Sequence, residues 1–134
     1  SIDAKGRIVL PAKFREELGE RFYLARGSGN RCVQVLSKQK FAEISEKINA
    51  LPVNKAMALQ YVFTATAVEV TPNAQGRVII PQTLREFAGL EKDVVLTGNL
   101  NRIEVWSKEK WNEICDYDDM DSIAESMQDM GITI

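Results

Sequence analysis

The stretch Asp3-Ala-Lys-Gly-Arg7-Ile-Val-Leu-Pro11-Ala-Lys-Phe-Arg15-Glu16 decides the fold of this chain. It returns about seventy positions later as Asn73-Ala-Gln-Gly-Arg77-Val-Ile-Ile-Pro81-Gln-Thr-Leu-Arg85-Glu86, with the glycine, both arginines, the proline and the glutamate in register. A second echo follows, because residues 35–44 are repeated at 105–114. The chain therefore contains two copies of one small unit, and the shared apolar positions predict a core that the copies close together.

The length and composition are those of a soluble globular protein. The chain has 134 residues, of which 45% are hydrophobic and 27% charged. No stretch is apolar for long enough to span a membrane, and no signal peptide precedes the first motif. We expect one compact body or two interlocked halves, in the cytoplasm.

Several classes of site are disfavoured by residue content. The chain has no histidine, and its two cysteines, Cys32 and Cys115, lie in dissimilar settings. This removes most metal sites and catalytic triads, although carboxylate or lysine chemistry stays open. No glycine-rich phosphate loop is present. We expect no catalysis, metal, cofactor or small-molecule substrate.

The charges are segregated along the chain. Residues 1–53 hold ten Lys and Arg against six acids, and residues 54–115 hold seven of each. The last nineteen residues contain six acids and no base: Asp116, Asp118, Asp119, Asp121, Glu125 and Asp129. The sequence thus predicts a basic body followed by an acidic tail.

Each copy has the pattern of a strand, a short helix, two strands and a longer helix. The apolar runs 8–10 and 78–80 indicate strands covered on both faces. Helices are expected at 11–18 and 81–88, starting at a proline and ending at a left-handed glycine, Gly19 or Gly89. Hairpins follow at 22–25 with 32–36 and at 94–97 with 103–106.

Serines and a linking segment complete the pattern. Ser37 and Ser107 are predicted N-caps of the longer helices, and a helix over about 55–63 should join the copies. Residues 64–71 alternate like a strand that leads into the second motif, whereas the first motif begins almost at residue 1. We infer that the opening strand of the first copy is missing or comes from elsewhere, which would leave an edge that invites another chain.

The glycine and arginine of the motif have two interpretations. On an extended segment Asp3, Lys5 and Arg7 project to one side, and Gly6 allows a turn or a close approach. An arginine held beside a lysine and an aspartate suits a phosphate or a guanine edge. The alternative is an ordinary surface ion pair in a basic turn. Repetition of the arginine as Arg77 leaves the two interpretations evenly balanced.

In this combination the residues resemble the MraZ family of bacterial regulators. The resemblance rests on Asp3-x-x-Gly-Arg7 followed by strand, proline and helix, on the second Gly-Arg-x-x-x-Pro unit, and on the strand Asn101-Arg-Ile-Glu-Val-Trp106. It covers nearly all of residues 1–115. It implies an α+β fold of two tandem, pseudo-symmetric SpoVT/AbrB-like units, each swapped-hairpin and barrel-like, packed as one body with flanking helices.

The resemblance also implies an organisation and a function. Unit 1 would span 1–44 without its opening strand, linking helices 45–66, unit 2 67–110, and a C-terminal helix with the acidic tail 111–134. The protein would assemble into a homo-oligomeric ring in the nucleoid. It would control the division and cell-wall gene cluster by binding direct repeats in promoter DNA.

The DNA-contact motif of the family, an aspartate and an arginine four residues later, falls on Asp3 and Arg7. The second copy departs from it, because Asn73 replaces the aspartate and Gln75 the lysine. Amides can read base edges but do not neutralise phosphates, so the second copy either recognises DNA or only supports the first. The candidate DNA-binding residues are Asp3, Lys5, Gly6, Arg7, Asn73, Gln75, Gly76 and Arg77.

Other features have simpler explanations. Arg15 and Arg85 are expected to be exposed helix arginines beside Glu16 or Glu86. Trp106 and Trp111 should belong to a core or an interface. The end of the chain, with Ile123, Met127 and Met130, is either an amphipathic helix or a disordered acidic tail, and the spacing favours the helix.

The sequence as a whole predicts a transcriptional regulator that binds DNA and has no catalytic activity. An enzyme on a related barrel is one alternative, which the absence of histidine disfavours. An antitoxin-like module that binds a protein partner is the other.

Overall fold

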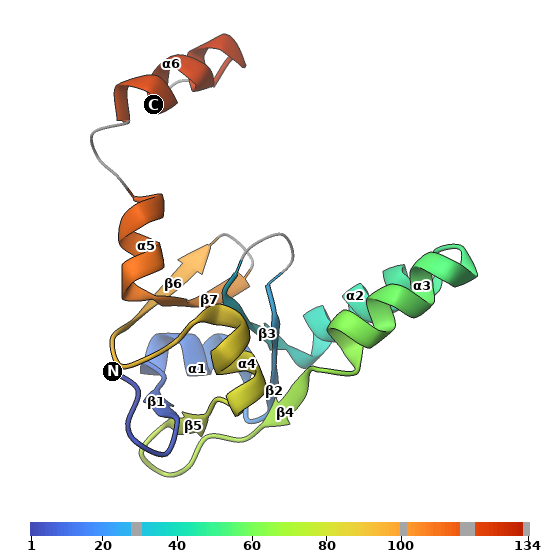
Figure 1. Ribbon diagram of the computed structural model, residues 1–134. Coiled ribbons are helices and arrows are strands. Elements are labelled where there is room, and N and C mark those ends of the chain that lie inside the picture. The colour runs from blue at the N-terminus through green and yellow to red at the C-terminus, as the bar shows by residue number, and fades with distance from the viewer. Residues whose placement is uncertain (28–30, 100–101, 116–119, 133–134) are drawn as a thin grey trace.

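A computed structural model gives the fold, and it describes residues 1–27, 31–99, 102–115 and 120–132. The chain is α+β, with a two-stranded and a five-stranded antiparallel sheet (Figure 1). The elements are β1 (Arg7–Val9), α1 (Ala12–Leu18), β2 (Phe22–Arg26), β3 (Val33–Ser37), α2 (Lys38–Asn49), α3 (Val53–Leu59), the π-helix η1 (Gln60–Thr64), β4 (Val68–Val70), β5 (Arg77–Ile79), α4 (Gln82–Ala88), β6 (Val94–Asn99), β7 (Arg102–Ser107), α5 (Lys108–Ile114) and α6 (Met120–Asp129).

The predicted helix signals operate in both copies. Pro11 and Pro81 precede the first turns of α1 and α4. The Ser37 hydroxyl accepts the backbone N–H of Lys40 at 3.1 Å, and Ser107 caps α5 in the same way. These bonds satisfy N–H groups that have no partner within the helix. The predicted caps are therefore confirmed.

The two glycines after the short helices differ. Gly89 is left-handed helical, with φ 65° and ψ 32°, as predicted. Gly19 has a positive φ of 81° but an extended ψ of −165°, so the prediction of the same left-handed cap there is wrong. Two residues separate Gly19 from β2, whereas four separate Gly89 from β6. The shorter connection requires the chain to extend at once.

The five-stranded sheet joins the hairpins of the two copies. Its order is β4-β2-β3-β7-β6, and β3 pairs with β7 at the centre, with Val35 opposite Ile103. The predicted hairpins β2–β3 and β6–β7 are confirmed. At one edge β4 covers β2; at the other, none of the described strands pairs with the outer side of β6.

The barrel-like closure that the resemblance implies is not found. The strands β1 and β5 pair with each other and form no ladder with the larger sheet in the described part of the chain. Each of them is only three residues long. The space between the two sheets is filled instead by α1, α4 and apolar side chains.

The main core lies between the two sheets and includes residues of both copies. Ile8, Leu10 and Ile80 are almost fully buried there. The prediction that both short strands are covered on two faces is wrong, because Val9 is 53% and Ile79 57% exposed. A two-stranded ribbon turns alternate side chains outward, and no described element covers its outer face.

A second core forms where the helical hairpin α2–α3–η1 meets the sheet. Ala25, Leu36, Ile48 and Phe63 are buried in it. The linking helix begins at Val53, earlier than predicted, and continues through η1. The strand expected over 64–71 is consequently limited to β4, because residues 64 and 65 belong to the end of the helical segment.

A buried polar cluster lies within the sheet. The Arg102 Nε atom forms a salt bridge with the Glu104 carboxylate at 2.9 Å, and the Trp106 indole donates a hydrogen bond to that carboxylate at 3.2 Å. The Cys32 thiol donates to the same carboxylate at 3.7 Å. The predicted core position of Trp106 is confirmed, since its side chain is buried. The carboxylate of Glu104 thus has one charged partner and two hydrogen-bond donors in place of water.

Cys32 should be nearly inert to thiol reagents. Burial, followed by the charge of Glu104, raises the pKa of the Cys32 thiol to about 12. About one molecule in ten thousand then carries the reactive thiolate at pH 8. Mass spectrometry after brief treatment with iodoacetamide at this pH should find Cys115 modified and Cys32 intact. Rapid labelling of Cys32 in the folded protein would contradict its placement in the cluster.

The C-terminal segment is helical over residues 120–129, where α6 forms (Figure 1). Of the two alternatives for this segment, the helix is therefore correct for those residues. Asp116, Asp118 and Asp119 of the predicted acidic tail lie outside the described residues. Among the helices that the structure describes, none has the length and apolar character needed to cross a membrane.

Candidate nucleic-acid interface

Pairing of β1 with β5 brings the two sequence motifs together. In the antiparallel register, Arg7 lies opposite Ile79 and Val9 opposite Arg77. Side chains that face each other in this way lie on the same side of a sheet. Since Ile8 and Val78 point into the core, the four other side chains form the outer face. We call residues 3–10 and 73–80 the paired ribbon.

The ribbon is also tied together at its ends. The backbone N–H of Leu10 donates to the Gly76 carbonyl at 2.9 Å, and that of Ile80 donates to the Gly6 carbonyl at 2.9 Å. Each motif loop is thereby held against the strand of the other copy. The first loop (residues 3–7) and the second loop (residues 73–77) lie at opposite ends of the ribbon.

Both loops have the same hydrogen-bonded form. In the first loop, the Asp3 Oδ1 atom accepts the N–H groups of Lys5 and Arg7, each at 2.9 Å. In the second, the Asn73 Oδ1 atom accepts those of Gln75 at 3.0 Å and Arg77 at 2.9 Å. An aspartate or an asparagine can supply this oxygen. The replacement of Asp3 by Asn73 therefore leaves the loop backbone unchanged.

The glycine of each loop has a positive φ, 81° for Gly6 and 76° for Gly76. Residues with a Cβ rarely adopt this conformation. The turn that the sequence predicted at these glycines is confirmed.

The loops differ in how their arginines are held. The Arg7 Nε atom donates to the Asp3 Oδ2 atom at 2.7 Å, which fixes the direction of the guanidinium. Asn73 has no second carboxylate oxygen, and Arg77 forms no salt bridge with any described residue. Arg7 is therefore oriented by its own loop, whereas Arg77 is exposed and less constrained.

The hydrogen bonds of the first loop favour the charged form of Asp3. The backbone N–H of Arg7 is the main cause that lowers the pKa of Asp3 below its ordinary value of 3.8, with further contributions from the Arg7 side chain and the Lys5 N–H. A lowered folded pKa means that the stabilisation is complete above the ordinary pKa and is lost as the pH falls through the folded value. The loop thus keeps its form at neutral pH.

Asp3→Asn tests which part of the aspartate matters. The asparagine should retain both backbone hydrogen bonds, as Asn73 does, but release Arg7. We expect an unchanged melting temperature and, with the ribbon as a DNA-binding surface, a loss of DNA affinity of roughly threefold to tenfold, smaller than the loss for Arg7→Ala. Fluorescence anisotropy with labelled duplexes measures it. The matched control is Asn73→Ala, which removes the loop bonds of the second copy. A larger effect of Asp3→Asn than of Arg7→Ala would contradict a positioning role for Asp3.

The two helix arginines are placed differently from the expectation. Arg15 and Arg85 were predicted to lie beside Glu16 or Glu86, yet neither forms a salt bridge with a residue in the described ranges. A Cβ on Gly76 would lie 2.9 Å from the Arg15 Cζ atom. Arg85 contacts Gly6 in the same way. Each arginine thus packs against the loop of the other copy, a contact that only the paired ribbon creates.

The outer face combines two kinds of side chain. Arg7 lies beside Ile79 at one end and Arg77 beside Val9 at the other, so the two arginines occupy opposite corners, and both apolar side chains are more than half exposed. Lys5 and Gln75 are exposed in the loops. A two-stranded ribbon fits the major groove of DNA, where arginine can bind guanine and apolar groups can contact thymine methyls. The sequence motif pointed to the arginines but gave no sign that the apolar pair is exposed.

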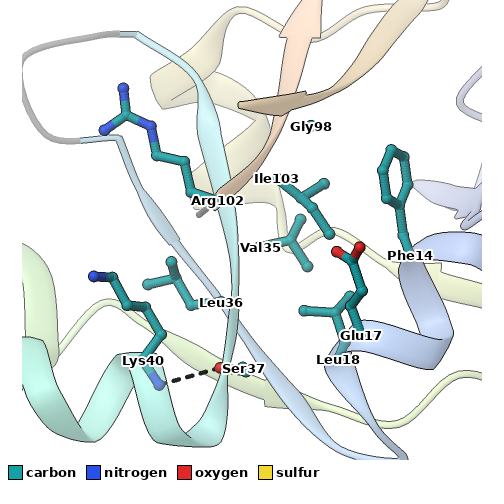
Figure 2. Close-up of a pocket in the computed structure, with 10 residues that line it drawn as sticks. All are labelled: Phe14, Glu17, Leu18, Val35, Leu36, Ser37, Lys40, Gly98, Arg102 and Ile103. Carbon is teal, nitrogen blue, oxygen red and sulfur yellow. Dashed lines mark hydrogen bonds between the residues drawn. The ribbon is translucent and has the colours of Figure 1, made fainter. Parts of the chain in front are cut away.

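A hollow elsewhere on the molecule is separate from this face. It has a volume of about 330 Å³. Figure 2 shows it between α1 and the strands β3 and β7. Arg102 and Lys40 extend on one side of it, Glu17 stands on the other, and Val35 and Ile103 form an apolar wall. None of its lining residues belongs to the paired ribbon.

Comparison with known proteins identifies the family. The family model described as "MraZ protein, putative antitoxin-like" matches residues 1–60 and 63–131. A protein of Thermoanaerobacter sp. (strain X514) named "Transcriptional regulator MraZ" is 46% identical, over 98% of this chain and 94% of its own length. Proteins with the same name from Acetivibrio thermocellus and Lachnoclostridium phytofermentans are each 45% identical, over 98% of this chain and 94% and 93% of their own lengths. With the family model covering almost the whole chain and such relatives matching it nearly end to end, the chain belongs to the MraZ family.

Proposed function

We propose that this protein is a sequence-specific, DNA-binding transcriptional regulator without catalytic activity, and that the paired ribbon is its DNA-binding surface. The observation that carries the proposal is the outer face of the ribbon, where two arginines from the two motifs each lie beside an exposed apolar side chain of the other strand. The relatives named as transcriptional regulators support it. A buried core under the ribbon holds this face rigidly, which recognition of base edges requires.

The residues of the ribbon have distinct roles in this proposal. Arg7, oriented by Asp3, donates to a guanine edge, and Arg77 makes the corresponding contact from the second loop. Lys5 and Gln75 reach phosphate or sugar groups beside each loop. Gly6 and Gly76 shape the turns, and Asn73 holds the second loop as Asp3 holds the first.

The apolar pair on the outer face has its own role. Val9 lies beside Arg77 and Ile79 beside Arg7, where each can contact a thymine methyl group next to the base that its neighbour binds. Their replacement by alanine removes apolar surface that is already largely in contact with water, so it should weaken recognition of particular sequences more than it weakens the fold.

The family resemblance extends the proposal to targets and assembly. The protein would bind direct repeats in promoter DNA of the bacterial division and cell-wall gene cluster, as a ring of identical subunits in the cytoplasm and nucleoid. One ribbon carries few cations, so a single unit would bind weakly at cellular salt. Several linked ribbons would raise the affinity by roughly a hundredfold or more if the spacing permits simultaneous binding.

The number and phasing of DNA repeats test both recognition and assembly. A first step selects a binding sequence from random duplex DNA with the unmodified protein. Duplexes with one, two or three direct copies are then compared with an inverted pair and with a variant in which one copy is shifted by half a helical turn. We expect affinity to rise with copy number and to fall with the shift, because ring subunits present their ribbons in one sense around the circle. Affinity that ignores both would exclude the ring arrangement, and failure to enrich any sequence would exclude specific recognition.

An antitoxin-like, protein-binding function is the second candidate. The words "putative antitoxin-like" in the family description favour it. It requires a protein that remains bound to the purified chain in a fixed ratio and that competes with DNA or replaces it. Purification from the native host, followed by separate assays for bound protein and bound DNA, distinguishes the two functions.

A further inference from the structure

The contact between each helix arginine and the opposite loop is unusually close. A Cβ built on Gly6 would lie 2.9, 3.0 and 3.1 Å from the Cζ, Nε and Nη1 atoms of Arg85. A Cβ built on Gly76 would lie 2.9, 3.1 and 3.1 Å from the same three atoms of Arg15. Three guanidinium atoms at nearly equal distance mean that the flat group lies against the glycine. Both glycines are buried, although each belongs to an otherwise exposed loop.

In the described part of the chain, these guanidinium groups donate no side-chain hydrogen bond. The Nε atoms of Arg15 and Arg85 are buried and have no hydrogen-bond partner. Neither group forms a salt bridge among residues 1–27, 31–99, 102–115 and 120–132. An arginine stays charged at any physiological pH and has five donors in a planar arrangement. Such a group, held in place and without a carboxylate partner, is suited to an anion from outside the protein.

The helix arginines also make the formal charges of the two loops equal. In the first loop, Asp3 cancels one of the two cations Lys5 and Arg7, and Arg85 raises the net charge to plus two. In the second loop, Arg77 is the only charged residue, and Arg15 again raises the net charge to plus two. The electrostatic difference that the substitutions in the second motif create is thus compensated by an arginine from the other copy.

We propose that Arg15 and Arg85 contact DNA phosphates, and that each completes the DNA-binding loop of the opposite copy. Arg85 completes the first loop and Arg15 the second. The ligand is a backbone phosphate next to the bases that Arg7 and Arg77 contact. This inference rests on the proposed function, since it assumes that the ribbon faces DNA. The second loop then has as many cations for phosphate binding as the first has in excess, because Arg15 of α1, from the other copy of the same chain, supplies its second cation.

The salt dependence of binding distinguishes a phosphate contact from a structural one. Each phosphate contact adds about 0.9 to the slope of log affinity against log salt concentration. The slope is measured for the unmodified protein, Arg15→Gln, Arg85→Gln and the double variant, on the selected duplex and on random duplex DNA. We expect the slope to fall by about one for each variant. Affinity should fall by the same factor on both duplexes, so that the specificity ratio stays within about twofold.

Two controls complete the experiment. Lys47→Gln removes the same charge from the exposed surface of α2, remote from the ribbon in Figure 1, and should leave the slope unchanged. Arg15→Lys and Arg85→Lys keep the charge and should keep most of the slope. If a glutamine variant does not fold, the lysine variants supply the measurement. Lysine keeps the charge but not the flat guanidinium group, so a retained salt slope indicates a phosphate contact and a lost slope indicates a role in stacking.

Three results would overturn the proposal. One is an unchanged slope in a folded glutamine variant, and another is a loss of specificity without a change in slope, which would make the arginines supports of the loop. The third is an equal loss of slope for Lys47→Gln, which would indicate a general charge effect. The proposed function itself fails separately, if Arg7→Ala leaves specific binding intact.

Discussion

Arg7→Ala is expected to abolish specific DNA binding while the fold and the assembly stay intact. The side chain is about one-third exposed and belongs to the outer face of the ribbon, so its removal opens no cavity. Loss of a bidentate guanine contact costs on the order of 1 to 3 kcal/mol per site, which is a factor of roughly 5 to 150. The Asp3 carboxylate, left without its partner, would then face the phosphates and add repulsion. In a linked assembly the loss is repeated at each bound site.

The measurement is the ratio of affinities for the selected and the scrambled duplex, with melting temperature and oligomeric state as controls. Arg77→Ala is the matched variant, because the same side chain is removed from the second loop. We expect a smaller loss, since Arg77 lacks the orienting carboxylate and pays more to become ordered. If both variants change the ratio of affinities equally and negligibly, the ribbon is not the DNA-binding surface.

Among the substitutions proposed, Arg102→Met is expected to cause the largest loss in the free energy of unfolding. The Glu104 side chain is 5% exposed, and Arg102 is its only charged partner in the described part of the chain. Without the arginine, a buried carboxylate would keep only the neutral donors Cys32 and Trp106. Breaking a buried ion pair costs about 3 to 5 kcal/mol. We expect about 3 kcal/mol, because the Arg102 side chain is itself 34% exposed.

The prediction is tested by denaturant unfolding of Arg102→Met, Glu104→Gln and the double variant. A loss of about 3 kcal/mol lowers the melting temperature by roughly 10 °C. The double variant should recover part of the loss, because it no longer holds an unpaired charge, and the cycle gives the coupling energy. Additive effects of the two single changes would mean that the pair does not stabilise the sheet.

Local signals in the sequence were sufficient for most of the helices and strands. Ser37 and Ser107 cap helices by accepting the N–H group three residues later, and Pro11 and Pro81 precede the helix turn that they start. Each signal therefore lies within a few residues of the structure that it determines. The hairpins were predicted for the same reason. The linking helix was placed about two residues too late at its start, which is Val53 after Pro52, whereas its predicted end at about Phe63 is one residue from the observed Thr64.

The candidate site was predicted in part. The spacing pointed to Asp3, Arg7 and Arg77, which the structure brings onto one ribbon, and the loops have the turns expected of their glycines. The exposure of Val9 was missed because an apolar run does not reveal how many of its faces a sheet will cover. The contact of Arg15 with Gly76 was missed because it joins residues about sixty positions apart.

The crossed arrangement of β1 and β5 also determines when a newly made chain can act. The strand β5 follows β1 by seventy residues, so the ribbon cannot exist until more than half of the polypeptide has left the ribosome. Pairing of the two strands closes a long loop of chain and so costs conformational entropy, and we expect it to occur late in folding. A fragment made from either half alone would retain a motif but no recognition surface. Premature termination or proteolysis between the halves should therefore yield pieces that lack the paired ribbon and with it the proposed DNA-binding surface.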